Sequence, residues 1–162
     1  SLIIHAISKI ENCELTIYGD GPLYGRIENL INELGLIDRV RQIKSIDNIE
    51  LCQQIRLSDL MVLYSEYWEL SKVMIESILT GLPLVINCNP SEKNLEFMNL
   101  PVTLVPATPE DFRRTITDLS LDASLREKIG RQFIASSENF LNPNIAENNH
   151  KLAYEEILLS YA

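Results

Sequence analysis

Residues 60–87 read LMVLYSEYWELSKVMIESILTGLPLVIN, and this stretch decides the fold class. The run LMVLYS at 60–65 is continuously apolar, which is typical of a strand buried on both faces of a parallel sheet. SKVMIESILTG at 71–81 predicts a helix that ends at Gly81, and LPLVIN at 82–87 predicts a second buried strand. A strand, a helix and a strand in this order predict two parallel strands joined by a crossover helix.

The alternation of strand and helix continues on both sides of this unit. Short apolar runs predict further strands at 14–19, 39–43 and 102–106, with helices between and after them. The repeated alternation predicts an α/β fold, namely a three-layer, doubly wound parallel sheet of the Rossmann-like kind with helices on both faces. Ligands of such sheets bind beyond the carboxyl ends of the strands.

The two ends of the chain differ from this regular middle. SLIIHAISKIE opens directly in a helical apolar pattern without a Met, so we expect a piece of a longer protein, cut near the beginning of a helix. A Pro-containing break precedes a last helix with an apolar stripe that includes Tyr154 and Ile157. We therefore divide the chain into residues 1–141, an N-terminally truncated Rossmann-like domain, and residues 142–162, a C-terminal helix.

The composition and the net charge make some classes of partner and site unlikely. The 162 residues carry a formal net charge of -9, which disfavours nucleic acid because phosphate backbones need a basic footprint. No apolar run reaches the roughly 20 residues that a membrane-spanning helix needs. The 3 cysteines lack close pairing, which fits a reducing compartment and argues against a zinc site or a disulfide framework. We expect a cytoplasmic protein without a bound metal or cofactor.

The helix at 71–81 has a polar stripe with two interpretations. At about 100° per residue, Lys72, Glu76 and Thr80 fall together in the gap left by a wide apolar arc. The first interpretation is a solvated face with an i,i+4 ion pair, although a lysine in the first turn opposes the helix dipole. The second is an anion site, in which exposed amides, Ser71 and Lys72 meet a phosphate and Glu76 accepts hydrogen bonds from ribose hydroxyls. The residues by themselves leave both open.

Three other kinds of site are discounted. GDGP at 19–22 is not a dinucleotide-binding fingerprint, because Tyr24 stands where a third glycine is required, and Asp20 is interpreted as a turn or cap residue. A receiver-type phosphorylation site would need clustered aspartates at strand ends, whereas Asp59 lies at a strand start. Hydrolysis by a Ser/His/Asp triad would need a nucleophile motif such as GxSxG, which the chain lacks.

With these pieces in order, the chain resembles the C-terminal, nucleotide-sugar-binding half of family 4 glycosyltransferases with the GT-B fold. The stretches that carry the resemblance are ELTIYGDGPLYGRIENLINELGL, RVRQIKSIDNIELCQQIRLSDLMVLYS, SKVMIESILTGLPLVIN and VTLVPATPEDFRRTITDLSLDASLREKIG. It implies transfer of a sugar from a UDP- or GDP-sugar to an acceptor, with retention and without an essential metal, as in polysaccharide biosynthesis. The donor would lie between two Rossmann-like domains, and residues 142–162 would be the crossover helix.

The resemblance also assigns roles to residues. Glu76 would bind the ribose hydroxyls of the donor. The residues at the start of the same helix would meet the diphosphate and the donor sugar: Leu70, Ser71, Lys72 and the amide of Val73. The loop after the second strand would lie near the base: Lys44, Ser45 and Ile46.

The chain departs from the family pattern at several places. Counting back from Glu76, the first glutamate of the family's Glu-x7-Glu motif should stand at 68, but Trp68 is there and Glu69 follows. Either a loop residue has been deleted and Glu69 takes the catalytic role, or the first carboxylate is missing. The sequence LSKV matches a variant of this loop, which favours the deletion. The family's Gly-Gly donor loop is replaced by NCNPSE.

The family's first strand and its acceptor domain have no counterpart in this sequence, so we expect them upstream. The isolated fragment is then expected to be inactive, and any membrane association would come from the upstream part. Two alternatives remain open. One is a non-catalytic module of the same fold, and the other is a GT-B-type sugar-nucleotide epimerase.

Overall fold

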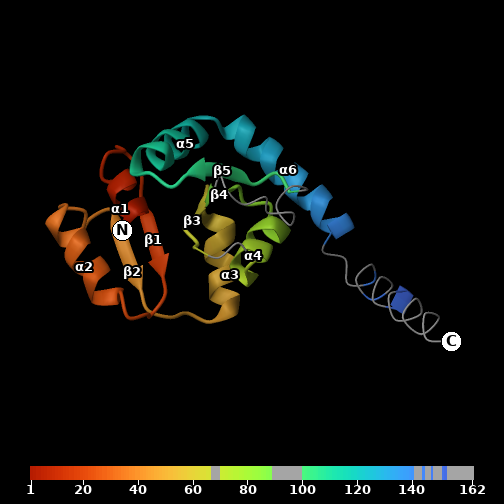
Figure 1. Cartoon of the computed structure of the whole chain (residues 1–162), viewed down its shortest axis with the longest axis horizontal. Helices are drawn as coiled ribbons and strands as arrows, with labels where there is room; N and C mark the ends of the chain where they lie inside the picture. Colours follow the sequence, from red (N-terminus) through yellow and green to blue (C-terminus); the bar gives the residue numbers. More distant parts are fainter. Residues whose placement is uncertain (67–69, 89–99, 141–143, 145–146, 148–150, 153–162) are drawn as a thin grey trace.

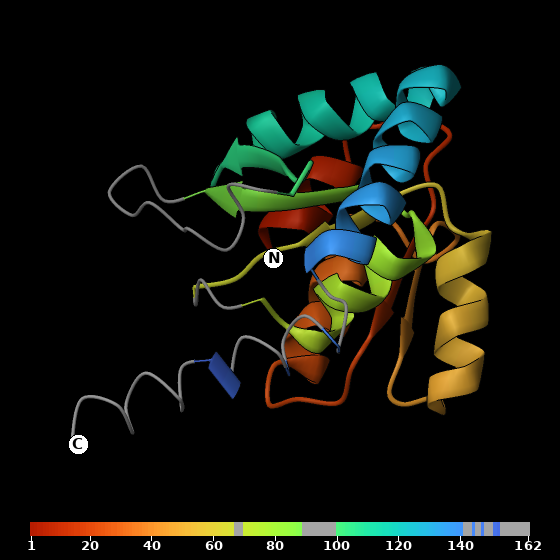
Figure 2. The same ribbon diagram turned by 90° about the vertical axis from the view of Figure 1, so that its right-hand side faces the viewer.

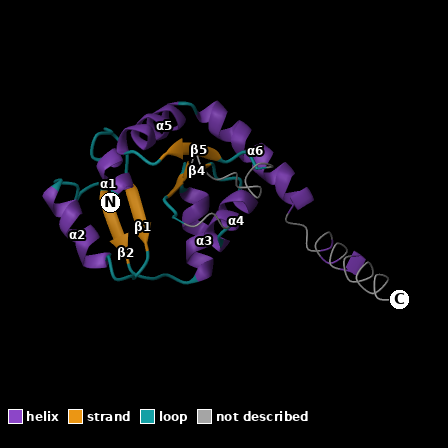
Figure 3. Ribbon diagram, in the orientation of Figure 1, coloured by secondary structure: helices purple, strands orange, loops and turns teal. Residues whose placement is uncertain are grey.

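The computed structural model of the chain describes residues 1–66, 70–88, 100–140, 144, 147 and 151–152. Strands and helices alternate along most of this length (Figures 1 and 3). The elements are, in chain order, α1 (Leu2–Ile7), β1 (Leu15–Tyr18), α2 (Tyr24–Glu33), β2 (Val40–Ile43), α3 (Asn48–Leu57), β3 (Met61–Leu63), α4 (Lys72–Thr80), β4 (Leu84–Cys88), β5 (Thr103–Pro106), α5 (Pro109–Leu121) and α6 (Ala123–Phe140).

Every strand pairing in the described part of the chain is parallel. Strand β1 pairs with β2, and β4 pairs with β3 on one side and β5 on the other. The predicted parallel α/β fold is therefore confirmed. The strands nevertheless form two sheets, β1–β2 and β3–β4–β5, where the sequence predicted one, because β1 and β3 are not paired with each other. Within each sheet the carboxyl ends of the strands lie at the same edge.

Helices cover both faces of the β3–β4–β5 sheet, as predicted. Helix α5 lies on one side of the green strands β4 and β5, and helix α4 lies on the other (Figures 1 and 2). Helix α1 packs against α5, and α4 packs against α6. These helices contribute much of the most deeply buried part of the core, which includes Met74, Ile78, Phe112, Ile116 and Phe133.

The two strands of the stretch 60–87, β3 and β4, differ in burial. In β4, Leu84, Val85 and Ile86 are at most 1% exposed, so the prediction of a buried strand is confirmed there. The same prediction for 60–65 is wrong, since Met61–Leu63 are only half-buried and Tyr64 is 47% exposed. The physical reason is that β3 has a neighbour on one side only and forms the edge of its sheet.

Glycines fix the far end of α4. Gly81 adopts the left-handed conformation (φ 72°), and the Leu82 N–H then donates to the Ser77 carbonyl at 2.9 Å, so the helix ends where predicted. Helix α6 crosses directly over this turn. A β-carbon on Gly130 would lie 2.5 Å from the Gly81 carbonyl oxygen, so the crossing requires a glycine at 130.

The C-terminal region was predicted to be a helix over 142–162. Residues 144, 147, 151 and 152 are helical, and the rest of this range lies outside the described residues, as do Tyr154 and Ile157. The division of the chain at 141 therefore stays a prediction. Across the described part of the chain, none of the helices is long and apolar enough to cross a membrane.

Candidate functional site

The centre of the candidate site is the N-terminus of α4, which follows the carboxyl end of β3. Ser71 occupies the N-cap position with extended backbone (φ -71°, ψ 157°), as the sequence predicted. Its hydroxyl makes no capping hydrogen bond, and the first turn contains no acidic residue. The first N–H groups of a helix have no acceptor within the helix, so this end presents free donors and the positive pole of the helix dipole.

Lys72 and Glu76 lie one turn apart on this helix, and the predicted ion pair is present. The Lys72 Nζ and Glu76 Oε1 atoms are 3.7 Å apart. The pair is asymmetric, because the lysine side chain is 80% exposed and the glutamate side chain only 14%. A long contact to so exposed a lysine stabilises a protein little, and the ammonium group is free to reach a ligand. The Glu76 carboxylate, by contrast, is largely shielded from solvent.

Thr80 completes the polar stripe without adding to the ligand-facing groups. Its hydroxyl donates to the backbone carbonyl of Glu76 at 2.8 Å and to that of Ser77 at 3.0 Å. It therefore leaves the Glu76 carboxylate available.

Leu70 and Val73 flank the start of the helix in a different way from Ser71 and Lys72. Both side chains are half-buried and pack against the hydrophobic core. What these two residues offer to a ligand is therefore their backbone. Glu69, the candidate catalytic carboxylate, lies outside the described residues, as does Trp68.

Helix α3 approaches the same site from the other sheet. Its first residue, Asn48, places Oδ1 3.5 Å from the Lys72 Nζ atom. Asp47 caps α3, with Oδ1 accepting from the Glu50 N–H at 2.9 Å. The segment that follows β2 therefore runs to the start of α3, where Asn48 contacts Lys72. Sequence reasoning missed Asn48, and no local pattern could have identified it, because the contact spans 24 positions.

The predicted base-binding loop lies between β2 and α3. Lys44 and Ser45 are exposed and Ile46 is half-buried. The Lys44 Nζ atom lies 5.0 Å from the centroid of the Tyr24 ring, a cation–π contact to the first residue of α2. The structure therefore brings the loop toward α4 through Asn48, while the charge of Lys44 itself is directed to α2.

Two hydrogen bonds tie β2 to the start of α2. The Gln42 side chain donates to the Tyr24 carbonyl at 3.2 Å, and the Tyr24 hydroxyl donates to the Gln42 carbonyl at 3.4 Å. Burial, followed by the negative charge of Glu50, raises the pKa of the Tyr18 phenol at the end of β1. The carboxyl end of β2 is thus tied to the start of α2.

Comparison with known proteins identifies what shares this arrangement. A family model described as glycosyl transferases group 1 matches residues 1–134. Alpha-D-kanosaminyltransferase of Streptomyces kanamyceticus is 31% identical over 119 residues, which are 73% of this chain and 31% of that protein. This chain thus spans about a third of that curated relative.

Two solved structures share the fold. Sucrose-phosphate synthase of Thermosynechococcus elongatus superposes with a TM-score of 0.80 and 20% identity, covering 98% of this chain and 42% of that chain. The Anabaena protein HepE in complex with UDP-glucose superposes with a TM-score of 0.75 and 22% identity, covering 93% of this chain and 44% of that chain. The predicted Rossmann-like fold is confirmed by this likeness.

Proposed function

Because the chain belongs to the glycosyl transferase group 1 family, we propose that it is the C-terminal, donor-binding domain of a family 4 glycosyltransferase. The carrying observation is the α4 N-terminus, where an uncapped helix end, an exposed Lys72 and a half-buried Glu76 lie within one turn. Such an end binds anions through its free N–H groups and its dipole. The ligand that fits is the diphosphate of a UDP- or GDP-sugar.

Each residue then has a role. Ser71, Lys72 and the backbone of Leu70 and Val73 hold the diphosphate and the donor sugar. Glu76 accepts hydrogen bonds from the ribose hydroxyls, which suits a carboxylate that is 14% exposed beside a lysine side chain that is 80% exposed. The loop of Lys44, Ser45 and Ile46 faces the base, and Glu69 supplies the catalytic carboxylate.

The proposed reaction is transfer of the sugar, with retention, to an acceptor bound by a further domain of the complete enzyme. As the bond to the sugar breaks, negative charge develops on the leaving diphosphate. Preorganised donors aimed at that charge lower the barrier, and here these are the helix end and Lys72. HepE, which shares the fold, was solved with UDP-glucose, in keeping with this class of donor. The free cysteines Cys13, Cys52 and Cys88 favour a cytoplasmic, reducing location.

Calorimetry of the full-length enzyme tests the site. Lys72→Ala should weaken UDP or GDP binding by about tenfold or more while leaving nucleoside binding nearly unchanged, because hydrogen bonds to charged groups are worth about 1.5–3 kcal/mol. Glu76→Ala should weaken the nucleoside and the nucleotide alike. Lys9→Ala, an exposed lysine outside the site, is the matched control. Wild-type affinity in both site variants would sink the assignment.

A second candidate rests on the departures from the family motif, since Trp68 stands where the first glutamate is expected. The chain would then be a non-catalytic module of the same fold. Thermal melts of the full-length protein separate the two candidates. A nucleotide at 100 times its dissociation constant should stabilise the donor-binding domain by about 2.7 kcal/mol. Absence of any shift with UDP, GDP and their sugars would favour the module.

A further inference from the structure

Where β3 ends, the buried side chain of Asn87 forms the hydrogen bonds that a neighbouring strand would otherwise make. The parallel ladder between β3 and β4 stops at Leu63, which lies opposite Ile86. Beyond it, the Ser65 N–H donates to Asn87 Oδ1 at 2.8 Å, and Asn87 Nδ2 donates to the Ser65 carbonyl at 2.8 Å. The amide of Asn87 thus replaces the peptide group of a neighbouring strand and holds both polar groups of one backbone residue.

We propose that Asn87 is a positioning residue for the donor site, an inference that rests on the proposed function. Ser65 is where the chain leaves the sheet for the α4 N-terminus. The connection that begins there leads to Leu70 and Ser71, to which the proposal assigns contact with the donor. A clamp on its first residue reduces the freedom that donor binding must otherwise remove.

The burial of Asn87 and the long sequence separation of its partner support a positioning role. A side chain that only stabilised its own strand would not need to reach a distant segment. Asn87 is 4% exposed and follows three buried apolar residues of β4, where an apolar side chain would fill the core at no polar cost. Among the described residues, the other buried polar side chains bond close in sequence. The Ser77 hydroxyl donates to the Leu82 carbonyl, and the Ser137 hydroxyl donates to the Ile134 carbonyl. Asn87 instead reaches across 22 positions to the carboxyl end of a neighbouring strand.

The far end of α4 is fixed independently. Ser77 donates to the Leu82 carbonyl at 2.7 Å, and the Gly81 turn lies directly under Gly130. Loss of the Asn87 clamp should therefore leave the helix in place and loosen the connection that leads into it. The expected consequence is weaker donor binding in a protein that still folds.

The test compares two substitutions at 87 in the full-length enzyme, with UDP and GDP as probes. Asn87→Asp keeps the shape, and its carboxylate still accepts from Ser65 N–H but cannot donate to the Ser65 carbonyl. At pH 8 we expect the affinity for UDP and GDP to fall by about tenfold, which corresponds to the loss of one to two ordinary hydrogen bonds. Burial and the facing carbonyl should raise the pKa of the new carboxyl, so that lowering the pH restores the donor and the affinity relative to wild type.

Asn87→Leu is the second variant, because an apolar side chain of similar size keeps the buried strand packed. It should lose affinity to the same extent without recovering at low pH. Ser137→Ala, which removes a hydrogen bond from α6, is the control for general destabilisation and should bind as wild type.

The outcomes are distinguishable. Affinity within twofold of wild type in Asn87→Leu at pH 8 would overturn the positioning role while leaving the proposed function intact. An equal loss in Ser137→Ala, or no recovery of Asn87→Asp at low pH, would do the same. A wild-type enzyme that binds neither UDP nor GDP would overturn the proposed function and the positioning role together. Loss in both Asn87 variants with recovery in only the aspartate supports the inference.

Discussion

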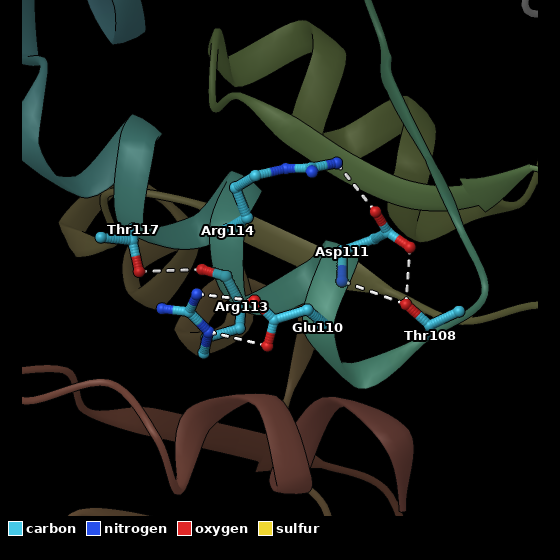
Figure 4. A network of polar contacts seen from close by, with 6 residues as sticks. All are labelled: Thr108, Glu110, Asp111, Arg113, Arg114 and Thr117. Atoms are coloured by element: carbon cyan, nitrogen blue, oxygen red, sulfur yellow. Dashed lines mark hydrogen bonds and ion pairs between the residues drawn. The ribbon is translucent and has the colours of Figure 1, made fainter.

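Helices α4 and α5 begin at equivalent places in the fold, but their N-termini differ in capping. Each follows a strand of the β3–β4–β5 sheet, at the edge where the carboxyl ends of the strands lie. At α5, Thr108 accepts from the Asp111 N–H at 3.1 Å and donates to its carboxylate at 2.6 Å (Figure 4). At α4, Ser71 makes no capping hydrogen bond. One helix start is closed by its own side chains and the other is left open.

The charges in the first turns of the two helices also differ. The first turn of α5 contains Glu110 and Asp111, which pair with Arg113 and Arg114 at 2.7 and 2.8 Å (Figure 4). These carboxylates complement the helix dipole and would repel an anion. The first turn of α4 contains no acidic residue and starts with Lys72. The strand-to-helix connection is common to both helices, and the capping bond and the sign of the first-turn charges distinguish α4, the proposed diphosphate site, from α5.

The largest expected effect comes from moving the whole of α4. In Gly130→Ala the new β-carbon would lie 2.5 Å from the Gly81 carbonyl oxygen, so α6 and α4 must separate. We expect the free energy of unfolding to fall by about 1–3 kcal/mol, as for other overpacked cores, while the cap of α5 stays intact. Urea denaturation measures this. Gly25→Ala is the matched control, since a β-carbon there meets nothing within 4 Å and should not lower the stability.

The next effect compares the two caps directly. Thr108→Ala removes the capping hydrogen bond from the Asp111 N–H and should lower the free energy of unfolding by about 0.5–2 kcal/mol. Ser71→Ala removes a hydroxyl that makes no capping bond, so the stability should stay within about 0.5 kcal/mol of wild type. Thermal or urea melts of the two variants decide the matter. An equal loss in both would mean that the two helix starts are alike and that the open end of α4 is not special.

The smallest effect concerns the pH dependence of the Glu110–Arg113 ion pair in the first turn of α5. The hydrogen bond from Arg113 holds the pKa of Glu110 below its usual value. A lowered pKa stabilises the fold above the ordinary carboxyl pKa, and that contribution is lost as the pH falls through the lowered value. In Arg113→Gln the pKa of Glu110 should rise toward its ordinary value, which an NMR titration of the carboxyl would detect. An unchanged titration would show that Arg113 is not what lowers the pKa of Glu110.

The sequence could predict what depends on local pattern. The helix at 71–81 and its end at Gly81 follow from spacing and turn chemistry, and both are confirmed. The difference between the two caps was also readable, because Thr108 is followed three positions later by Asp111, whereas Ser71 is followed by Met74. Such a pattern favours a cap that closes on itself at α5 only.

Other features depend on which segments meet in space. The apolar run at 60–65 reports hydrophobicity but not the number of neighbouring strands, so β3 was taken for a buried strand and is an edge. The contacts of Asn48 with Lys72 and of Asn87 with Ser65 join residues more than 20 positions apart. Nothing within a helical or strand period reports such pairs.

The edge position of β3 has a consequence for the behaviour of the protein in concentrated solution. An apolar edge strand is a template on which another chain can add a strand, and long, flat edges of this kind lead to aggregation. Strand β3 runs only from Met61 to Leu63 before the chain is drawn to Asn87. A short edge offers few backbone groups for recruitment, so the short length of β3 itself limits the addition of another chain.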